Sequence, residues 1–120
     1  MTKRERILAR LERGLERVKA GWFQGKNFNA IDAEGNEAFP HCGDASAWST
    51  CGAVSGVDHF GQVIDVKSAV AELGITVSAY HPGLGGSAYQ FNEKEGQTHQ
   101  AVIELFEKTI ERLKKEIEHE

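Results

Sequence analysis

Apolar residues recur every three or four positions at the start of the chain. This stripe consists of Leu8, Leu11, Leu15, Val18 and Trp22. The spacing places all of them on one face of a helix. Thr2 and Glu5 have the three-residue separation of a capping box, in which each side chain bonds a free amide of the first turn. Gly21 is expected to end this helix.

A second apolar stripe occupies the end of the chain. Its positions advance by alternating four- and three-residue steps through Ile103, Phe106, Ile110, Leu113 and Ile117. Thr98 has the hydroxyl group that caps a helix N-terminus. Such seams are typical of helices that pack on other helices. Two arrangements stay open: the terminal helices pack on each other within one chain, or the five C-terminal residues form the interface of a homodimer.

Between these helices, two apolar segments flank a polar one. Residues 28–31 and 38–39 lie on either side of residues 32–37, which have Gly and Asn where a turn needs them. This pattern predicts a β-hairpin. Residues 75–80 are β-branched and aromatic, and are the strongest strand candidate in the chain.

Two shorter helices are expected in the same region. The first has Asp44 as its N-cap and ends near Gly56. The second begins at Asp65 and is ended by Gly74. The predicted fold is therefore α+β in a single domain over residues 1–120. Long amphipathic N- and C-terminal helices pack with two shorter helices and a two- or three-stranded antiparallel β element.

Composition narrows the range of functions. The 120 residues include 14 Lys and Arg against 18 Asp and Glu, whereas nucleic-acid-binding domains normally have a basic surplus. No apolar run approaches the ~20 residues of a membrane span, and the charged N-terminus lacks the apolar region of a signal peptide. Two cysteines in a chain that can form a core without disulfides indicate a reducing cytoplasm.

Positive charge is concentrated at the start of the chain. Residues 1–20 contain seven Lys and Arg against three Glu. The arginines alternate with glutamates at helix-neighbour spacings, which favours ion pairing within the chain. A basic face for phosphate or for an acidic partner is the alternative.

Candidate catalytic chemistry rests on a few scattered residues. His41, Cys42 and Asp44 precede the expected second helix, whose dipole would favour a thiolate at Cys42. His59 and His81 are further candidates for an acid–base role. Since no signature motif of a hydrolase, metalloprotease or nucleotide-binding enzyme occurs, the sequence favours a non-enzymatic role.

A zinc site is the other chemistry that these residues suggest. Its ligands would be His41, Cys42, Cys51 and His59. Structural zinc sites usually present their ligands as close pairs, whereas the two cysteines are nine positions apart. No metal or other cofactor is therefore expected, and Cys51 is expected to lie in the core.

A glycine-rich segment follows the strand candidate. Residues 83–88 match the dinucleotide-binding pattern G-x-G-x-x-A. That pattern needs a helix directly behind it and a βαβ unit, but the next residues lack helical periodicity. A surface loop is expected, and a small-ligand site at Pro82–Gly86 with nearby aromatic residues is an alternative function.

Several short motifs together resemble a family of small uncharacterised bacterial and phage proteins. They are the turn Gly21-Trp22, the helix motif Gly52-Ala53-Val54 after Ala47-Trp48, and the closing motif Phe91-Asn92, Gly96-Gln97-Thr98 and Val102. The likeness extends over about residues 21–106. Ser49 and Glu93 depart from it, where members often have Cys and Asp. The resemblance implies a shared fold without a known activity, and it fits an accessory protein that binds a host protein.

The closing motif has a structural explanation. Asn92 is suited to tying a loop through side-chain–backbone bonds, Gly96 to a tight turn, and Thr98, like Thr2, to capping a helix. The distinctive features of the sequence are thus packing seams, and a non-enzymatic protein-interaction module is the favoured function. A small enzyme or metal-binding protein using His41, Cys42, Asp44 and His81 is the alternative.

Overall fold

The computed structural model describes residues 1–25, 27–58 and 61–120, and begins with helix α1 (Lys3–Ala20). The Thr2 Oγ1 atom accepts a hydrogen bond from the Glu5 amide at 3.2 Å, and Glu5 Oε1 accepts one from the Thr2 amide at 2.9 Å. These bonds form the capping box. The helix ends where the Gly21 amide donates to the Arg17 carbonyl.

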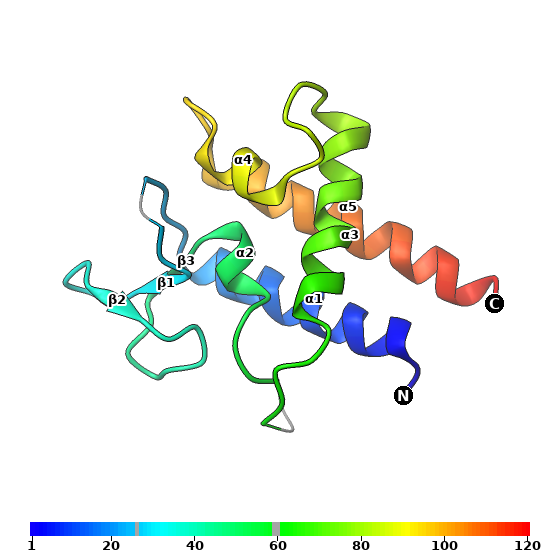
Figure 1. Ribbon diagram of the computed structural model, residues 1–120, viewed down its shortest axis with the longest axis horizontal. Helices are drawn as coiled ribbons and strands as arrows, with labels where there is room; N and C mark the ends of the chain where they lie inside the picture. Colours follow the sequence, from blue (N-terminus) through cyan, green and yellow to red (C-terminus); the bar gives the residue numbers. More distant parts are fainter. Residues whose placement is uncertain (26, 59–60) are drawn as a thin grey trace.

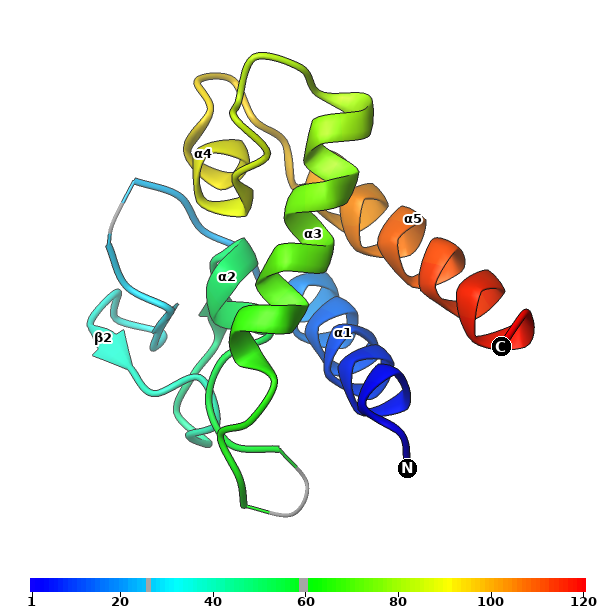
Figure 2. The same cartoon turned by 45° about the vertical axis from the view of Figure 1, so that its right-hand side comes forward.

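Helix α5 (His99–Glu118) lies antiparallel to α1, as Figures 1 and 2 show. The ends of the chain therefore meet: Arg4 Nη1 lies 2.8 Å from Glu120 Oε1. Lys114 Nζ lies 3.7 Å from Glu12 Oε2 further along the pair. The terminal helices pack on each other within one chain.

Helix α3 (Val66–Tyr80) crosses this pair (Figure 2). The strand predicted over residues 75–80 is therefore wrong, and Gly74 lies inside the helix. Leu73 and Val77 are buried four residues apart on its inner face. Gly74 lets the backbone at Gly86 approach, because an added Cβ would lie 2.4 Å from the Gly86 carbonyl oxygen. Tertiary packing outweighs the β preference of the segment here.

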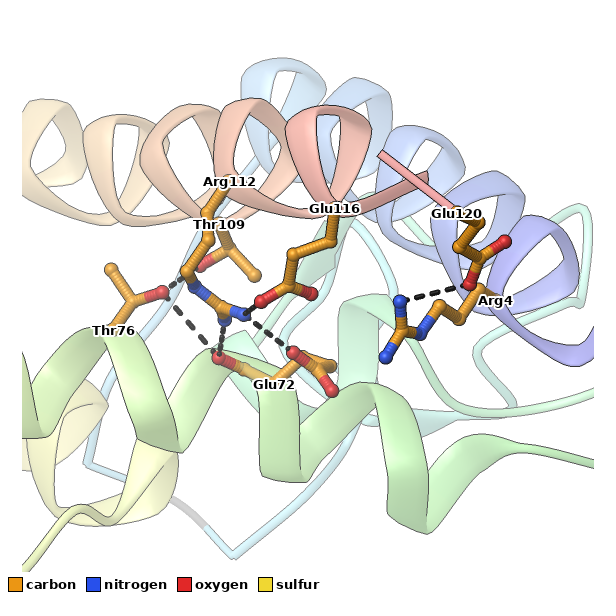
Figure 3. A network of polar contacts seen from close by, with 7 residues as sticks. All are labelled: Arg4, Glu72, Thr76, Thr109, Arg112, Glu116 and Glu120. Carbon is orange, nitrogen blue, oxygen red and sulfur yellow. Dashed lines mark hydrogen bonds and ion pairs between the residues drawn. The ribbon is translucent and has the colours of Figure 1, made fainter. Parts of the chain in front are cut away.

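Polar side chains join α3 to α5 (Figure 3). The buried hydroxyl groups of Thr76 and Thr109 lie 2.6 Å apart. Arg112 donates to the Glu72 side chain at 2.8 Å and to the Glu72 carbonyl at 3.0 Å. Because each buried hydroxyl has a partner, these threonines can lie between the two helices without an unsatisfied polar group.

The β element is a three-stranded antiparallel sheet of β1 (Ala30–Ile31), β2 (Glu37–Ala38) and β3 (Ala47–Trp48), in the order β2-β1-β3. The predicted hairpin is confirmed by the pairing of β1 with β2. Its turn is held by Asp32, whose Oδ1 atom accepts the amides of Glu34 and Asn36.

The second predicted helix is much shorter than expected. Helix α2 (Thr50–Ala53) begins after Ser49, whose hydroxyl accepts the Gly52 amide at 3.0 Å. The prediction of Asp44 as its N-cap is wrong, because the residues after Asp44 pair with β1 as strand β3.

A further short helix, α4 (Ala88–Glu93), follows the glycine-rich loop, although no helix was predicted there. Ser87 caps it by accepting the Gln90 amide at 3.1 Å. The part of the chain that the structure describes thus has three helices shorter than the terminal pair, where two were expected. The α+β fold class itself is confirmed.

One core lies where α1, α3 and α5 meet. Its buried members are Ile7, Leu11, Val18, Ala53, Val54, Ala69, Leu73, Val77, Ala88, Phe91, Val102, Leu105, Phe106, Ile110 and Leu113. Within the described residues, none of the helices combines the length and apolar character that crossing a membrane requires.

Candidate functional site

Four arginines follow one another along one face of α1. They are Arg6, Arg10, Arg13 and Arg17. Steps of four, three and four residues bring their side chains onto the same side of the helix. This face lies against the segment that leads from α2 to α3, drawn in green in Figure 2.

The arginines donate to main-chain carbonyl groups of that segment. Arg17 Nη1 donates to the Ala53 and Ser55 carbonyls, both at 3.0 Å. Arg10 Nη1 donates to the Val54 carbonyl at 2.8 Å and to the Gly56 carbonyl at 3.0 Å. Arg13 Nη1 donates to the residue 57 carbonyl at 2.9 Å. The carbonyls that a helix C-terminus leaves without partners are thus satisfied by α1.

Two of the four arginines, Arg10 and Arg17, are buried. Desolvation, together with the positive charges of Arg13 and Arg10, lowers the pKa of Arg17 to about 10. Desolvation also lowers the pKa of Arg10, opposed by the charges of Asp58 and Asp65. Arg17 therefore stays protonated at neutral pH. The Arg6 Nε atom is paired with Asp65 Oδ2 at 2.9 Å.

A cavity of about 160 Å³ lies between this face of α1 and the segment after α2. Its lining includes Ala9 and the four arginines on α1, with Ala53 and Ile64 opposite. The accessible wall is mostly carbon, because the guanidinium nitrogens point to the carbonyl groups and leave the methylene stems exposed.

Apolar side chains extend the cavity towards the surface. Met1 and Ile64 line it and are exposed, at 77% and 43%. Val63, next to Ile64, is 63% exposed. We call this surface, with the cavity and its arginines, the α1 face. The sequence shows the spacing of the arginines on the α1 face, but it does not show the apolar cavity that they line.

The predicted catalytic residues lie in two separate places. His41, Cys42 and Asp44 belong to the loop between β2 and β3, whereas His81 follows the last turn of α3. Figures 1 and 2 both place that loop and that end of α3 far apart. The His81 ring contacts Phe91 at a centroid distance of 4.7 Å, and burial lowers the pKa of His81.

The structure describes three of the four residues of the proposed zinc site. His59 lies outside the described residues. Among residues 1–25, 27–58 and 61–120, no three His, Cys, Asp or Glu side chains are arranged to hold a metal ion. Cys42 and Cys51 are both half-buried free thiols, and burial raises the pKa of Cys51.

The glycine-rich end of the loop Pro82–Gly86 packs against helix α3. Gly83, Gly85 and Gly86 have positive φ angles of 97°, 63° and 65°, which are backbone conformations that suit glycine. The contact of Gly86 with Gly74 fixes the loop to the helix. A small-ligand site in this loop stays a prediction.

The five interface candidates point into the chain's own core. Phe106, Ile110 and Leu113 are buried there, and Ile103 and Ile117 pack partly buried at its edge. In this fold the seam is therefore filled by α1 and α3.

Asn92 is the centre of a hydrogen-bond network that joins α4 to α2 and to the end of α1. Its Oδ1 atom accepts from Trp22 Nε1 at 2.7 Å and from the Thr50 amide and hydroxyl at 2.9 and 2.7 Å. Its Nδ2 atom donates to the Phe23 carbonyl at 3.3 Å and to Glu93 Oε2 at 2.7 Å. Asn92 is thus fully satisfied, which indicates a structural role.

The other two residues of the closing motif act at the start of α5. Gly96 has a φ of 77° in the turn that follows α4. The Thr98 hydroxyl accepts the Ala101 amide at 3.1 Å and so caps α5.

Comparisons with known proteins give a family. No curated protein and no solved structure matches the chain. One family model, described as a family of unknown function (DUF6197), matches residues 2–112, a longer span than the resemblance over residues 21–106 that the motifs predict. The chain belongs to this family of unknown function, DUF6197.

Proposed function

We propose that this chain is a non-enzymatic protein-interaction module that receives one apolar side chain of its partner in the cavity of the α1 face. The observation that carries the proposal is the carbon-walled cavity of about 160 Å³ between α1 and the segment after α2. Protein interfaces are commonly centred on such a pocket, which an anchor side chain fills.

The size of the cavity favours a single side chain over a metabolite. Pockets for drug-sized ligands have volumes of ~300–1,000 Å³, well above the observed volume. An engineered apolar cavity of ~150 Å³ accommodates benzene. The α1 face therefore suits one aromatic ring or one branched aliphatic group.

The surroundings of the cavity favour an acidic partner. Exposed Met1, Val63 and Ile64 add apolar area at the opening, and the four arginines outnumber Asp58 and Asp65 among the residues that line it. Arginine is enriched at protein interfaces, where its stem packs and its guanidinium group pairs with carboxylates. The partner segment is thus expected to present an apolar anchor beside Asp or Glu.

A minimal mimic of that segment tests the proposal. The probe is 3-phenylpropionate, which joins a phenyl ring to a carboxylate, and the readout is the backbone amide shifts of ¹⁵N-labelled protein. We expect saturable shifts centred on Ala9, Ala53 and Ile64. Ala9→Leu fills the cavity and is expected to abolish them.

The matched control is Ala71→Leu, which adds the same atoms to the exposed face of α3. It is expected to bind the probe as the wild type does. Shifts centred elsewhere, or undiminished binding by Ala9→Leu, would overturn the proposal.

A further inference from the structure

The β-hairpin side of the molecule is acidic, whereas the α1 face has more arginines than acidic residues. Residues 27–48 contain four acidic residues, Asp32, Glu34, Glu37 and Asp44, and no Lys or Arg. Both views place β2 at the outer edge of the molecule, away from the C-terminal end of α5 (Figures 1 and 2). One chain therefore presents an acidic edge and an arginine-lined face.

A large aromatic side chain projects from this acidic edge. Phe39 directly follows β2 and is 72% exposed. Its ring stacks on His41 at a centroid distance of 5.8 Å, and its carbonyl accepts the Cys42 amide at 3.0 Å. The stacking restricts the ring, and the carbonyl bond restricts the backbone at Phe39, before any partner binds, which lowers the entropy that binding costs.

We infer that the partner of the α1 face is a second copy of this chain, whose Phe39 ring enters the cavity. The inference rests on the proposed function and adds the identity of the partner. The phenyl ring of Phe39 has the size of benzene, which a cavity of ~150 Å³ accommodates, and the cavity measures about 160 Å³.

Charge complementarity supports the same pairing. Glu37 lies two residues before Phe39 and is exposed, so it enters the contact beside the ring. Arg6 and Arg13 line the cavity that receives the ring. Arg6 Nε is paired with Asp65 and Arg13 Nη1 with the residue 57 carbonyl, but each guanidinium group has further N–H donors that a carboxylate can accept. Opposite charges around an apolar anchor favour this orientation over others.

The symmetry of the contact limits the assemblies that it forms. Anchor and cavity are different surfaces, so a single contact is head-to-tail and extends to chains or rings. Two such contacts made reciprocally around a two-fold axis give a closed dimer. Either assembly dissociates on dilution and is weakened by salt, because raising the salt from ~0.1 M to ~1 M shortens the screening length from about 10 Å to about 3 Å.

Light scattering over a range of protein concentrations tests the inference. We expect the mass of the full chain to rise with concentration. Phe39→Ser is expected to weaken association by about thirtyfold, the effect of losing an anchor residue. The matched control is Ile75→Ser, which removes an apolar side chain that is 51% exposed on α3, and it is expected to associate as the wild type does.

A mixing experiment identifies the two surfaces directly. Phe39→Ser keeps the cavity, and Ala9→Leu keeps the anchor. At a protein concentration that lies above the dissociation constant of the wild type and well below that of either variant, each variant alone is expected to be monomeric, whereas their equimolar mixture is expected to form a 1:1 dimer.

A wild type that stays monomeric at all concentrations would overturn the inference, as would a Phe39→Ser variant that associates normally or a mixture that stays monomeric. If 3-phenylpropionate still binds at Ala9 in that case, the α1 face remains a binding site and only the second copy is rejected. If the probe fails as well, the proposed function falls with it.

Discussion

The arginines of α1 act mainly as donors to the main chain. Helix α2 is a single turn, so the carbonyl groups at its end and just beyond it need partners from elsewhere. Arg17 supplies two of these bonds from one nitrogen, and Arg10 supplies two more. Each Nη atom of a guanidinium group has two N–H bonds, so a single nitrogen can donate to two carbonyl groups. Holding this segment in place also shapes one wall of the cavity.

Among the polar residues, Asn92 is expected to contribute most to the free energy of unfolding. Replacing it by alanine removes the acceptor of three hydrogen bonds and leaves Trp22 Nε1 and two Thr50 groups without that partner. Each unsatisfied buried group costs roughly 1–3 kcal/mol. Asn92→Ala is expected to lower the free energy of unfolding by about 3 kcal/mol, measured by urea denaturation.

Asn36→Ala is the control for this substitution. Asn36 is exposed in the hairpin turn, and its backbone amide keeps its bond to Asp32. The control is expected to change the free energy of unfolding by no more than ~0.5 kcal/mol. Equal effects of the two variants would contradict the central role of Asn92.

Local chemistry made some of these roles predictable. The hydroxyl groups of Thr2 and Thr98 cap the helices that follow them because capping depends on residues a few positions away. The partners of Asn92 lie 42 and 70 positions away along the chain, so no spacing rule connects them. For the same reason, the sequence did not show which part of the chain the arginines of α1 contact.

At the scale of elements, periodicity identified the long helices and failed where distant segments meet. α1 and α5 have uninterrupted apolar stripes, and the hairpin has a turn sequence between its strands. Residues 75–80 have strand-like composition, yet their buried members Thr76 and Val77 lie three and four residues after buried Leu73, as on one face of a helix. β3 and α2 divide a segment that was predicted as one helix, because pairing with β1 depends on the fold.

A substitution at Gly74 tests how closely helix α3 packs against the loop at Gly86. Alanine there would favour the helix by about 1 kcal/mol over glycine, but its Cβ would lie 2.4 Å from the Gly86 carbonyl oxygen. Overpacking of this kind typically costs about 1–3 kcal/mol. We expect Gly74→Ala to lower the melting temperature.

Ser78→Ala, on the exposed side of the same helix, is the control. It improves helix propensity without adding atoms, and its melting temperature is expected to equal or slightly exceed that of the wild type. A stabilised Gly74→Ala variant would show that the loop at Gly86 does not pack against α3 in solution.

At the scale of the whole molecule, the antiparallel terminal helices close the chain on itself. The molecule is flat, with extents of 45 × 36 × 19 Å, and α3 crosses the α1–α5 pair on one side (Figure 2). This arrangement buries Phe106, Ile110 and Leu113 of the apolar seam of α5 and leaves Ile103 and Ile117 partly buried. The proposals therefore use two other surfaces, the α1 face and the acidic hairpin edge.

The variant Ile110→Asp distinguishes two roles for the apolar seam of α5: packing within one chain, or joining two copies of the chain. Ile110 is 7% exposed in the core, and an uncompensated buried charge costs roughly 3–5 kcal/mol. Domains of this size have only about 5–15 kcal/mol of stability, so we expect the variant to lose its cooperative thermal transition and its dispersed amide spectrum. Glu107→Ala, on the exposed side of α5, is expected to keep both. If Ile110→Asp instead stays folded and turns an associated wild type into a monomer, the α5 seam, rather than Phe39 and the α1 face, joins the two copies.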